Sequence, residues 1–253
     1  MKVAAIQHDI EWEDGEVTRA RLRAPIDQAA ADGARLIVLS EMYATGFSMR
    51  PERIAEPEGG PNEQFLIDSA VTHGCWVTGS IAQWQPGVER VARNVAVLAG
   101  PDGTVTRYAK IHPFSFAGEH LKYAAGTQLC TVDVEGLRVT LFVCYDLRFA
   151  DEFWAAGPGT DLFVVVANWP QARREHWRTL LRARAIENQA YVVGVNRVGV
   201  VKDLGYVGDS AIIDPMGEVL AENTGAEAVL TADVTARVVA DVRAQFPFLA
   251  DRR

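Results

Sequence analysis

The sequence contains few cysteines, and none of them are closely paired. Its 253 residues include three, Cys75, Cys130 and Cys144, without a Cys-x-x-Cys motif. An odd number at wide spacing argues against a disulfide framework and against a structural zinc site. The five histidines show no His-Glu-x-x-His spacing. We therefore expect neither a metal nor a cofactor.

Long apolar runs and excess positive charge are also absent. No stretch reaches the 18 apolar residues of a membrane span, and the first apolar segment is too short for a signal peptide. The formal net charge is -8, which argues against nucleic acid or an anionic membrane as the main partner. We expect a reduced, cytoplasmic protein with a small-molecule partner. An anionic substrate remains compatible, because it needs only one or two local cations.

Apolar segments typical of buried strands alternate with helical patterns along the whole chain. Strands are predicted at 2–7, 35–42, 75–84, 161–169, 190–199 and 227–234. Helices are predicted at 15–34, 62–74, 147–156, 174–189 and from about 235 onwards. Hairpins are predicted at 93–110, 129–144 and 210–222. With no linker or repeat, this order indicates one α/β domain over 1–253 with mixed sheets.

Three chemically reactive residues follow predicted strands. Glu41 comes after "RLIVLS", Lys110 after "VTRYA" and Cys144 after "LFV". Strand ends are where α/β folds place their sites, so the three side chains can converge. Each also has a simpler interpretation: a solvated or helix-capping Glu, a surface Lys, and a core Cys. Spacing alone does not decide between the two.

Several longer motifs resemble the nitrilase superfamily of carbon–nitrogen hydrolases, and in particular its ω-amidase branch. They are "SEMYATGFSM", "YAKIHPF", "GEH", "VCYDLRF", "ANWP" and "RARAIENQAYVVGVNRVG". The resemblance implies a four-layer α-β-β-α sandwich with two mixed β-sheets, a homodimer, and a catalytic triad of Glu41, Lys110 and Cys144. Ser40 departs from the family pattern, which usually has proline before the glutamate.

These residue types suit the hydrolysis of an amide. A cysteine thiolate is a nucleophile, and we expect a helix N-terminus after Cys144 to favour its charge. A carboxylate at Glu41 can carry protons. The Lys110 ammonium and the Tyr145 backbone N–H can stabilise the oxyanion. The resemblance adds Glu119, beside the triad, to hold Lys110 or steer protons.

The other end of the substrate is expected to be a carboxylate. Guanidinium groups match carboxylates bidentately, so Arg148, Arg173 and Arg174 are candidate clamps, although Arg148 also has a structural interpretation. Candidate aromatic walls are Tyr43, Phe47, Phe116 and Trp169, each of which also has a core interpretation. Asp146 is interpreted as a brace for the helix after the nucleophile.

Together these features predict a thiol amidase that converts 2-oxo dicarboxylic acid monoamides into the 2-oxo acid and ammonia. Two alternatives remain open at this point. One is a superfamily hydrolase of another substrate: a deaminated glutathione, an N-carbamoyl amino acid or a nitrile. The other is an inactive sandwich that serves as a binding scaffold.

Overall fold

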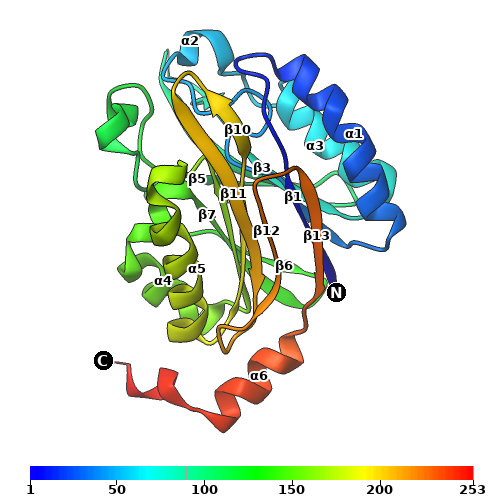
Figure 1. Ribbon diagram of the computed structural model, residues 1–253, viewed down its shortest axis with the longest axis vertical. Coiled ribbons are helices and arrows are strands. Elements are labelled where there is room, and N and C mark those ends of the chain that lie inside the picture. The colour runs from blue at the N-terminus through cyan, green and yellow to red at the C-terminus, as the bar shows by residue number, and fades with distance from the viewer. Residues whose placement is uncertain (89, 253) are drawn as a thin grey trace.

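Two β-sheets face each other, and a helical layer covers the outer face of each (Figure 1). The structure is a computed structural model that describes residues 1–88 and 90–252. Its α-helices are α1 (Gly15–Ala31), α2 (Pro51–Ile54), α3 (Pro61–His73), α4 (Ala150–Ala156), α5 (Arg174–Asn188) and α6 (Ala236–Gln245). Helices α1 and α3 cover one sheet, and α4 and α5 cover the other.

The first sheet has the strand order β13-β1-β2-β3-β4-β5. Its strands are β1 (Lys2–Gln7), β2 (Leu36–Val38), β3 (Trp76–Trp84), β4 (Ala92–Ala99), β5 (Val105–Ala109) and β13 (Ala228–Asp233). Strands β1, β2 and β3 run parallel, whereas the β3–β4, β4–β5 and β1–β13 pairs are antiparallel. The sheet is therefore mixed, as predicted.

The second sheet has the order β10-β11-β9-β8-β7-β6, with β12 paired to β11. Its strands are β6 (Thr131–Val134), β7 (Leu137–Val143), β8 (Leu162–Ala167), β9 (Tyr191–Asn196), β10 (Val198–Val201), β11 (Leu204–Ile213) and β12 (Val219–Thr224). The central β7–β8–β9 strands are parallel, and the remaining pairs are antiparallel.

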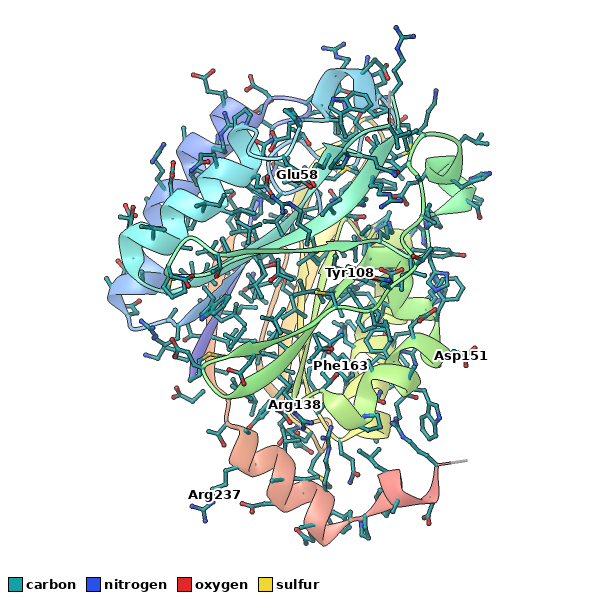
Figure 2. All side chains as sticks on the ribbon, turned by 180° about the vertical axis from the view of Figure 1, so that it is seen from behind. Glu58, Tyr108, Arg138, Asp151, Phe163 and Arg237 are labelled. Carbon is teal, nitrogen blue, oxygen red and sulfur yellow. The ribbon has the colours of Figure 1, made fainter. Side chains whose placement is uncertain are left out.

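The largest apolar cluster fills the space between the sheets and continues under α4 and α5. It includes Val3, Tyr108, Phe142, Phe163 and Trp177, all essentially inaccessible to solvent. Tyr108 and Phe163 point into this interior from different elements, whereas Arg237 on α6 points outward (Figure 2). A second cluster joins the first sheet to α1 and α3. Strands with both faces covered carry continuous apolar runs, which is why their sequences lack clear alternation.

Two predicted boundaries differ from the structure. Strand β2 ends at Val38, so Glu41 lies in a turn three residues beyond it. The predicted 147–156 helix is divided: Cys144–Arg148 forms the short 3₁₀ helix η3, and α4 begins at Ala150. Asp146 causes this division, since its carboxylate accepts the Val143 N–H at 3.0 Å and holds a tight turn. The structure confirms the predicted tail helix and all three predicted hairpins, which are β4–β5, β6–β7 and β11–β12.

Candidate active site

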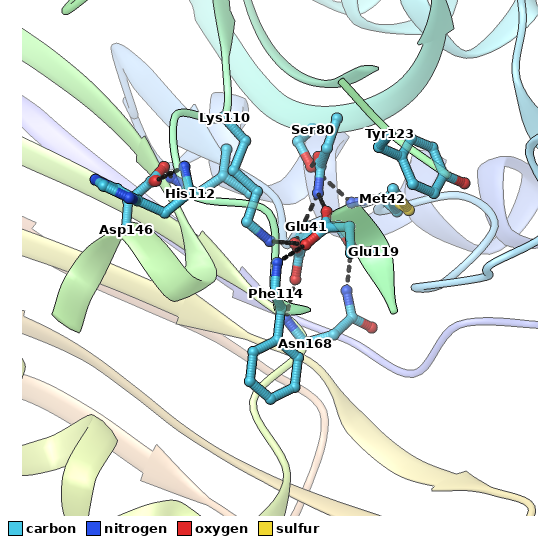
Figure 3. A network of polar contacts seen from close by, with 12 residues as sticks. Glu41, Met42, Ser80, Lys110, His112, Phe114, Glu119, Tyr123, Asp146 and Asn168 are labelled. Carbon is cyan, nitrogen blue, oxygen red and sulfur yellow. Dashed lines mark hydrogen bonds and ion pairs between the residues drawn. The ribbon is translucent and has the colours of Figure 1, made fainter. Parts of the chain in front are cut away.

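Glu41, Lys110 and Glu119 form one buried charge cluster between the two sheets (Figure 3). The Lys110 Nζ atom lies 3.0 Å from Glu41 Oε1 and 2.8 Å from Glu119 Oε2. All three side chains are at most 1% exposed. Lys110 follows β5, Glu41 follows β2 and Glu119 begins the 3₁₀ helix η2 (Glu119–Leu121). The polypeptide thus brings together groups that are 69 and 9 residues apart.

Asn94 on β4 connects the two carboxylates, and sequence reasoning missed it. Its Nδ2 donates to Glu41 Oε1 at 2.8 Å and to Glu119 Oε1 at 3.1 Å. Its Oδ1 accepts from Ser80 Oγ at 2.8 Å, and its carbonyl accepts the Lys110 N–H at 2.9 Å. One amide therefore fixes both acids and the lysine backbone. The signal was an Asn directly before the apolar run "VAVLA" of the same strand.

Asn168, directly after β8, fixes the far side of Glu41. Its backbone N–H donates to Glu41 Oε2 at 2.8 Å, and its Nδ2 donates to the Glu41 carbonyl at 2.5 Å. Glu119 is held in a similar way, because Phe114 N–H donates to its Oε2 at 2.5 Å. Both carboxylates are therefore locked in place by backbone donors.

Cys144 begins η3 at the end of β7 with φ at +48°. A non-glycine residue in the left-handed region costs on the order of 1–3 kcal/mol and persists only where its surroundings hold it. Asp146 provides that hold, since it also accepts His112 N–H at 2.8 Å and the Tyr108 hydroxyl at 2.9 Å. The brace predicted at Asp146 therefore ties the nucleophile turn to the segment that carries Lys110.

The electrostatics of this cluster favour a neutral thiol beside a charged lysine. Burial raises the pKa of the Cys144 thiol well above its usual range, and the Glu41 charge raises it further. Burial alone disfavours the Lys110 ammonium, but Glu119 and Glu41 outweigh it and raise the pKa of Lys110. The expected α-helix N-terminus is not there to offset this, because η3 is a five-residue 3₁₀ turn.

A cavity of about 160 Å³ opens beside Cys144. Its lining is mostly apolar and aromatic: Phe47, Phe114, Phe116, Ala117, Cys144, Tyr145, Arg148, Asn168, Trp169, Pro170, Arg173, Leu204 and Tyr206. The Glu41 and Lys110 side chains lie behind this lining, in the buried cluster. Such an apolar pocket with a few polar groups is typical of a small-molecule site.

Two of the three candidate arginines reach the cavity. The Arg148 guanidinium lies 4.7 Å from the Trp169 ring, and that of Arg173 lies 5.4 Å from the Phe114 ring. Neither has a carboxylate within 4.0 Å among residues 1–88 and 90–252. Burial lowers the pKa of Arg148, and the nearby Arg173 charge lowers it further. Two cations without a carboxylate partner at one cavity wall are the kind of groups that can hold an anion.

Two other predicted substrate contacts, Arg174 and Tyr43, lie outside the cavity lining. Arg174 points away from the cavity and makes a bidentate pair with Asp209, at 3.0 and 2.8 Å. Tyr43 is fully buried against Phe65, and its hydroxyl donates to the Asn62 carbonyl at 2.6 Å. Neither Arg174 nor Tyr43 is among the residues that line the cavity beside Cys144. Phe47, Phe116 and Trp169 do line the cavity.

The chain was compared with known proteins. The family model for carbon–nitrogen hydrolases matches residues 2–244. The chain belongs to this family. It is 39% identical to the Omega-amidase YafV of Yersinia enterocolitica, over 99% of this chain and 96% of that protein. It is 36% identical to a 2-oxoglutaramate amidase of Paenarthrobacter nicotinovorans, over 100% and 90%.

The solved structures extend this relationship to the fold of the carbon–nitrogen hydrolases. XC1258 from Xanthomonas campestris, a CN-hydrolase superfamily protein with an arsenic adduct in its active site, matches with a TM-score of 0.93. The two proteins are 37% identical, with 100% of this chain and 97% of that chain covered. The predicted family, the predicted α/β sandwich and the prediction of a hydrolase for carbon–nitrogen bonds are confirmed.

Within residues 1–88 and 90–252, no three His, Cys, Asp or Glu side chains gather into a metal-binding group. The absence of a metal and a cofactor stays a prediction. No helix in the described part of the chain is long and apolar enough to cross a membrane.

Proposed function

We propose that this carbon–nitrogen hydrolase is an ω-amidase that hydrolyses the terminal amide of 2-oxo dicarboxylic acid monoamides, such as 2-oxoglutaramate and 2-oxosuccinamate. One observation carries the proposal: Arg148 and Arg173 line the same small cavity as Cys144 and lack acidic partners within the described residues. The nucleophile is thus separated by a short apolar space from an anion subsite. The names of the relatives agree with this substrate class.

The first step joins proton transfer to nucleophilic attack. The Cys144 sulfur attacks the amide carbon as Glu41 takes the thiol proton, and the carbonyl electron pair moves to oxygen. The Lys110 ammonium and the Tyr145 N–H stabilise this oxyanion, where one such donor is worth about 3–4 kcal/mol. The raised thiol pKa supports attack concerted with deprotonation rather than a resting thiolate.

The second step releases ammonia and then water completes the cycle. Glu41 returns its proton to the amide nitrogen, the carbon–nitrogen bond breaks, and a thioester to Cys144 remains. Glu41 then takes a proton from water, whose oxygen attacks the thioester. Collapse of that intermediate returns the proton to sulfur and frees the 2-oxo acid. Glu119 does not line the cavity and acts by holding Lys110 and the Phe114 backbone.

The cavity favours a 2-oxo acid over an amino acid. No Asp or Glu is among the lining residues, so the ammonium of glutamine would face two guanidinium groups without a counter-charge. An uncharged 2-oxo oxygen accepts hydrogen bonds from the same surroundings. The volume of about 160 Å³ also favours a short dicarboxylate monoamide over a deaminated glutathione.

Ammonia release tests the proposal. The protein should release ammonia from 2-oxoglutaramate with kcat/KM at least tenfold above that for glutamine, deaminated glutathione, an N-carbamoyl amino acid or a simple nitrile. Cys144→Ala should abolish turnover, and Cys130→Ala, away from the cavity, should retain it. A preference for any other member of this panel would replace the proposed substrate. Equal turnover by Cys144→Ala and an active parent would refute the nucleophile, and no ammonia release by the parent from any member would favour a scaffold.

Three broader features accompany this proposal. We expect 1–253 to act as one catalytic domain, the protein to be cytoplasmic, and two copies to form a homodimer. Exposed apolar side chains on the α4 and α5 layer, Trp154 and Ile186, support a dimer. Light scattering of the purified protein should give twice the chain mass, and a monomeric mass would contradict it.

A further inference from the structure

Tyr206 lies at the boundary between the inner cavity and a larger outer groove. It is the third residue of β11 and lines both spaces. The groove has a volume of about 770 Å³ and shares Phe47, Ala117, Leu204 and Tyr206 with the cavity. Tyr206 is 8% exposed, so its ring forms part of the wall. Tyr206 is therefore part of the wall that the two spaces share.

The ring of Tyr206 is fixed from behind. The Arg197 guanidinium lies 4.9 Å from the ring centre and is itself 1% exposed. Asp9 and the Val198 carbonyl hold that guanidinium at 2.5 and 3.0 Å. A cation stacked on the ring and tied down in this way restricts the directions in which the hydroxyl can point.

The Tyr206 hydroxyl has no hydrogen-bond partner among residues 1–88 and 90–252. Three more deeply buried tyrosine hydroxyls do have partners: Tyr43 bonds Asn62, Tyr108 bonds Asp146 and Tyr123 bonds Ser48. The Tyr206 oxygen is not among the buried side-chain atoms without a partner, so it is open to solvent. Because Tyr206 lines the cavity, a molecule bound there can replace that solvent as the partner of the hydroxyl.

Tyr206 lines the same cavity as Cys144 and Arg173, so charges from both ends of the site act on it. Burial is the main cause that raises the pKa of Tyr206, and the charges of Cys144 and Glu41 raise it further. Arg197 and Arg173 act in the opposite direction. Charges at both ends of the site therefore act on the Tyr206 hydroxyl.

We propose that the Tyr206 hydroxyl donates a hydrogen bond to the 2-oxo oxygen of the substrate and so selects 2-oxo amides over their deoxy analogues. This inference rests on the proposed function. The oxo group lies between the amide carbon and the carboxylate, and it only accepts hydrogen bonds. Lys110 and Tyr145 N–H are used by the amide oxygen, and the arginines by the carboxylate. Tyr206 supplies the donor at the remaining position.

The test compares two substrates and two tyrosine variants. The substrates are 2-oxoglutaramate and the monoamide of glutaric acid, which lacks only the oxo group. Tyr206→Phe removes one oxygen and keeps the stacked ring. It should lower kcat/KM for 2-oxoglutaramate by roughly three- to tenfold, mainly through KM, since a neutral hydrogen bond contributes about that much. The glutaric monoamide should change less than twofold.

Tyr43→Phe is the matched control, because Tyr43 is also a buried tyrosine but is not among the residues that line the cavity. It should leave the ratio between the two substrates unaltered. A measurement on the unmodified protein is independent of any variant: 2-oxoglutarate should inhibit at lower concentration than glutarate. Equal inhibition, or equal losses for both substrates in Tyr206→Phe, would overturn the inference while leaving the proposed function intact. Failure of the unmodified protein to hydrolyse 2-oxoglutaramate would instead remove the proposed function and this inference together.

Discussion

Replacing Glu119 by glutamine should weaken catalysis and at the same time make the nucleophile easier to ionise. Glu119 accepts two hydrogen bonds at one oxygen, from Lys110 Nζ at 2.8 Å and from Phe114 N–H at 2.5 Å. Glutamine keeps an acceptor there but loses the charge. Charge-assisted bonds are about twice as strong as neutral ones, so the two together lose roughly 2–3 kcal/mol. If the loss falls on the transition state, kcat/KM drops roughly 30- to 150-fold.

The effect on the thiol has the opposite sign. The Glu119 charge is one of the causes that raise the pKa of Cys144, and Lys110 is the cation that lowers it. Removing the carboxylate while Glu41 still holds the ammonium should therefore lower the pKa of Cys144. The variant should be less active yet alkylate faster at a given pH, because the thiolate is the reactive form.

The assay is the pH dependence of Cys144 alkylation by iodoacetamide, followed by mass spectrometry beside ammonia release. The Glu119→Gln profile should shift to lower pH. Glu56→Gln is the control, since Glu56 is also buried and accepts two backbone N–H bonds, from Asn62 and Glu63, outside the site. A shift to higher pH, or a similar shift in Glu56→Gln, would refute the electrostatic role assigned to Glu119.

Three further predictions address other parts of the site. Burial raises the pKa of Asp146 to about 7. The folded protein therefore binds this proton more tightly than the unfolded chain does. The free energy of unfolding should fall as pH rises from about 4 to 7, by at most about 1.4 kcal/mol per pH unit. Denaturant unfolding should show a flatter pH slope in Asp146→Asn, and parallel slopes would contradict this. Arg173→Leu should raise KM for 2-oxoglutaramate roughly tenfold or more with kcat nearly kept, whereas Arg174→Leu should leave KM unchanged; the reverse pattern would reassign the anion subsite. Iodoacetamide should label Cys144 before Cys75, whose thiol is fully buried, and substrate should protect Cys144; faster labelling of Cys75 would count against the assigned nucleophile.

The order of elements was largely predictable from the sequence, because long apolar strands and tight turns are local features. Strand β1 and the β4–β5 and β6–β7 hairpins occur where the pattern indicates them. The start of α4 was not predictable, because it depends on one side chain. The Asp146 carboxylate accepts the Val143 N–H and so stabilises a 3₁₀ turn in place of an α-helix. This hydrogen bond exists only once the turn has formed, so the sequence pattern does not reveal it.

Side-chain direction was the harder part of the site. Arg173 and Arg174 are adjacent in sequence, but one faces the cavity and the other pairs with Asp209 on β11. Their difference is set by the junction of η5 (Gln171–Arg173) with α5, which turns successive residues to different sides. Asn94 was missed for a similar reason: its partners are 53 and 25 residues away, so no local pattern reveals them.

The charge balance of the cluster explains how a neutral thiol can serve as the nucleophile. Before attack, Lys110 faces two carboxylates, and a thiolate would add a third negative charge in a buried site. When Cys144 attacks, its proton neutralises Glu41 as the new negative charge forms on the substrate oxygen. The net charge around Lys110 is unchanged, and the anion has moved from one side of the ammonium to the other. The buried lysine therefore needs neither to gain nor to lose a proton, and Glu119 keeps it charged throughout.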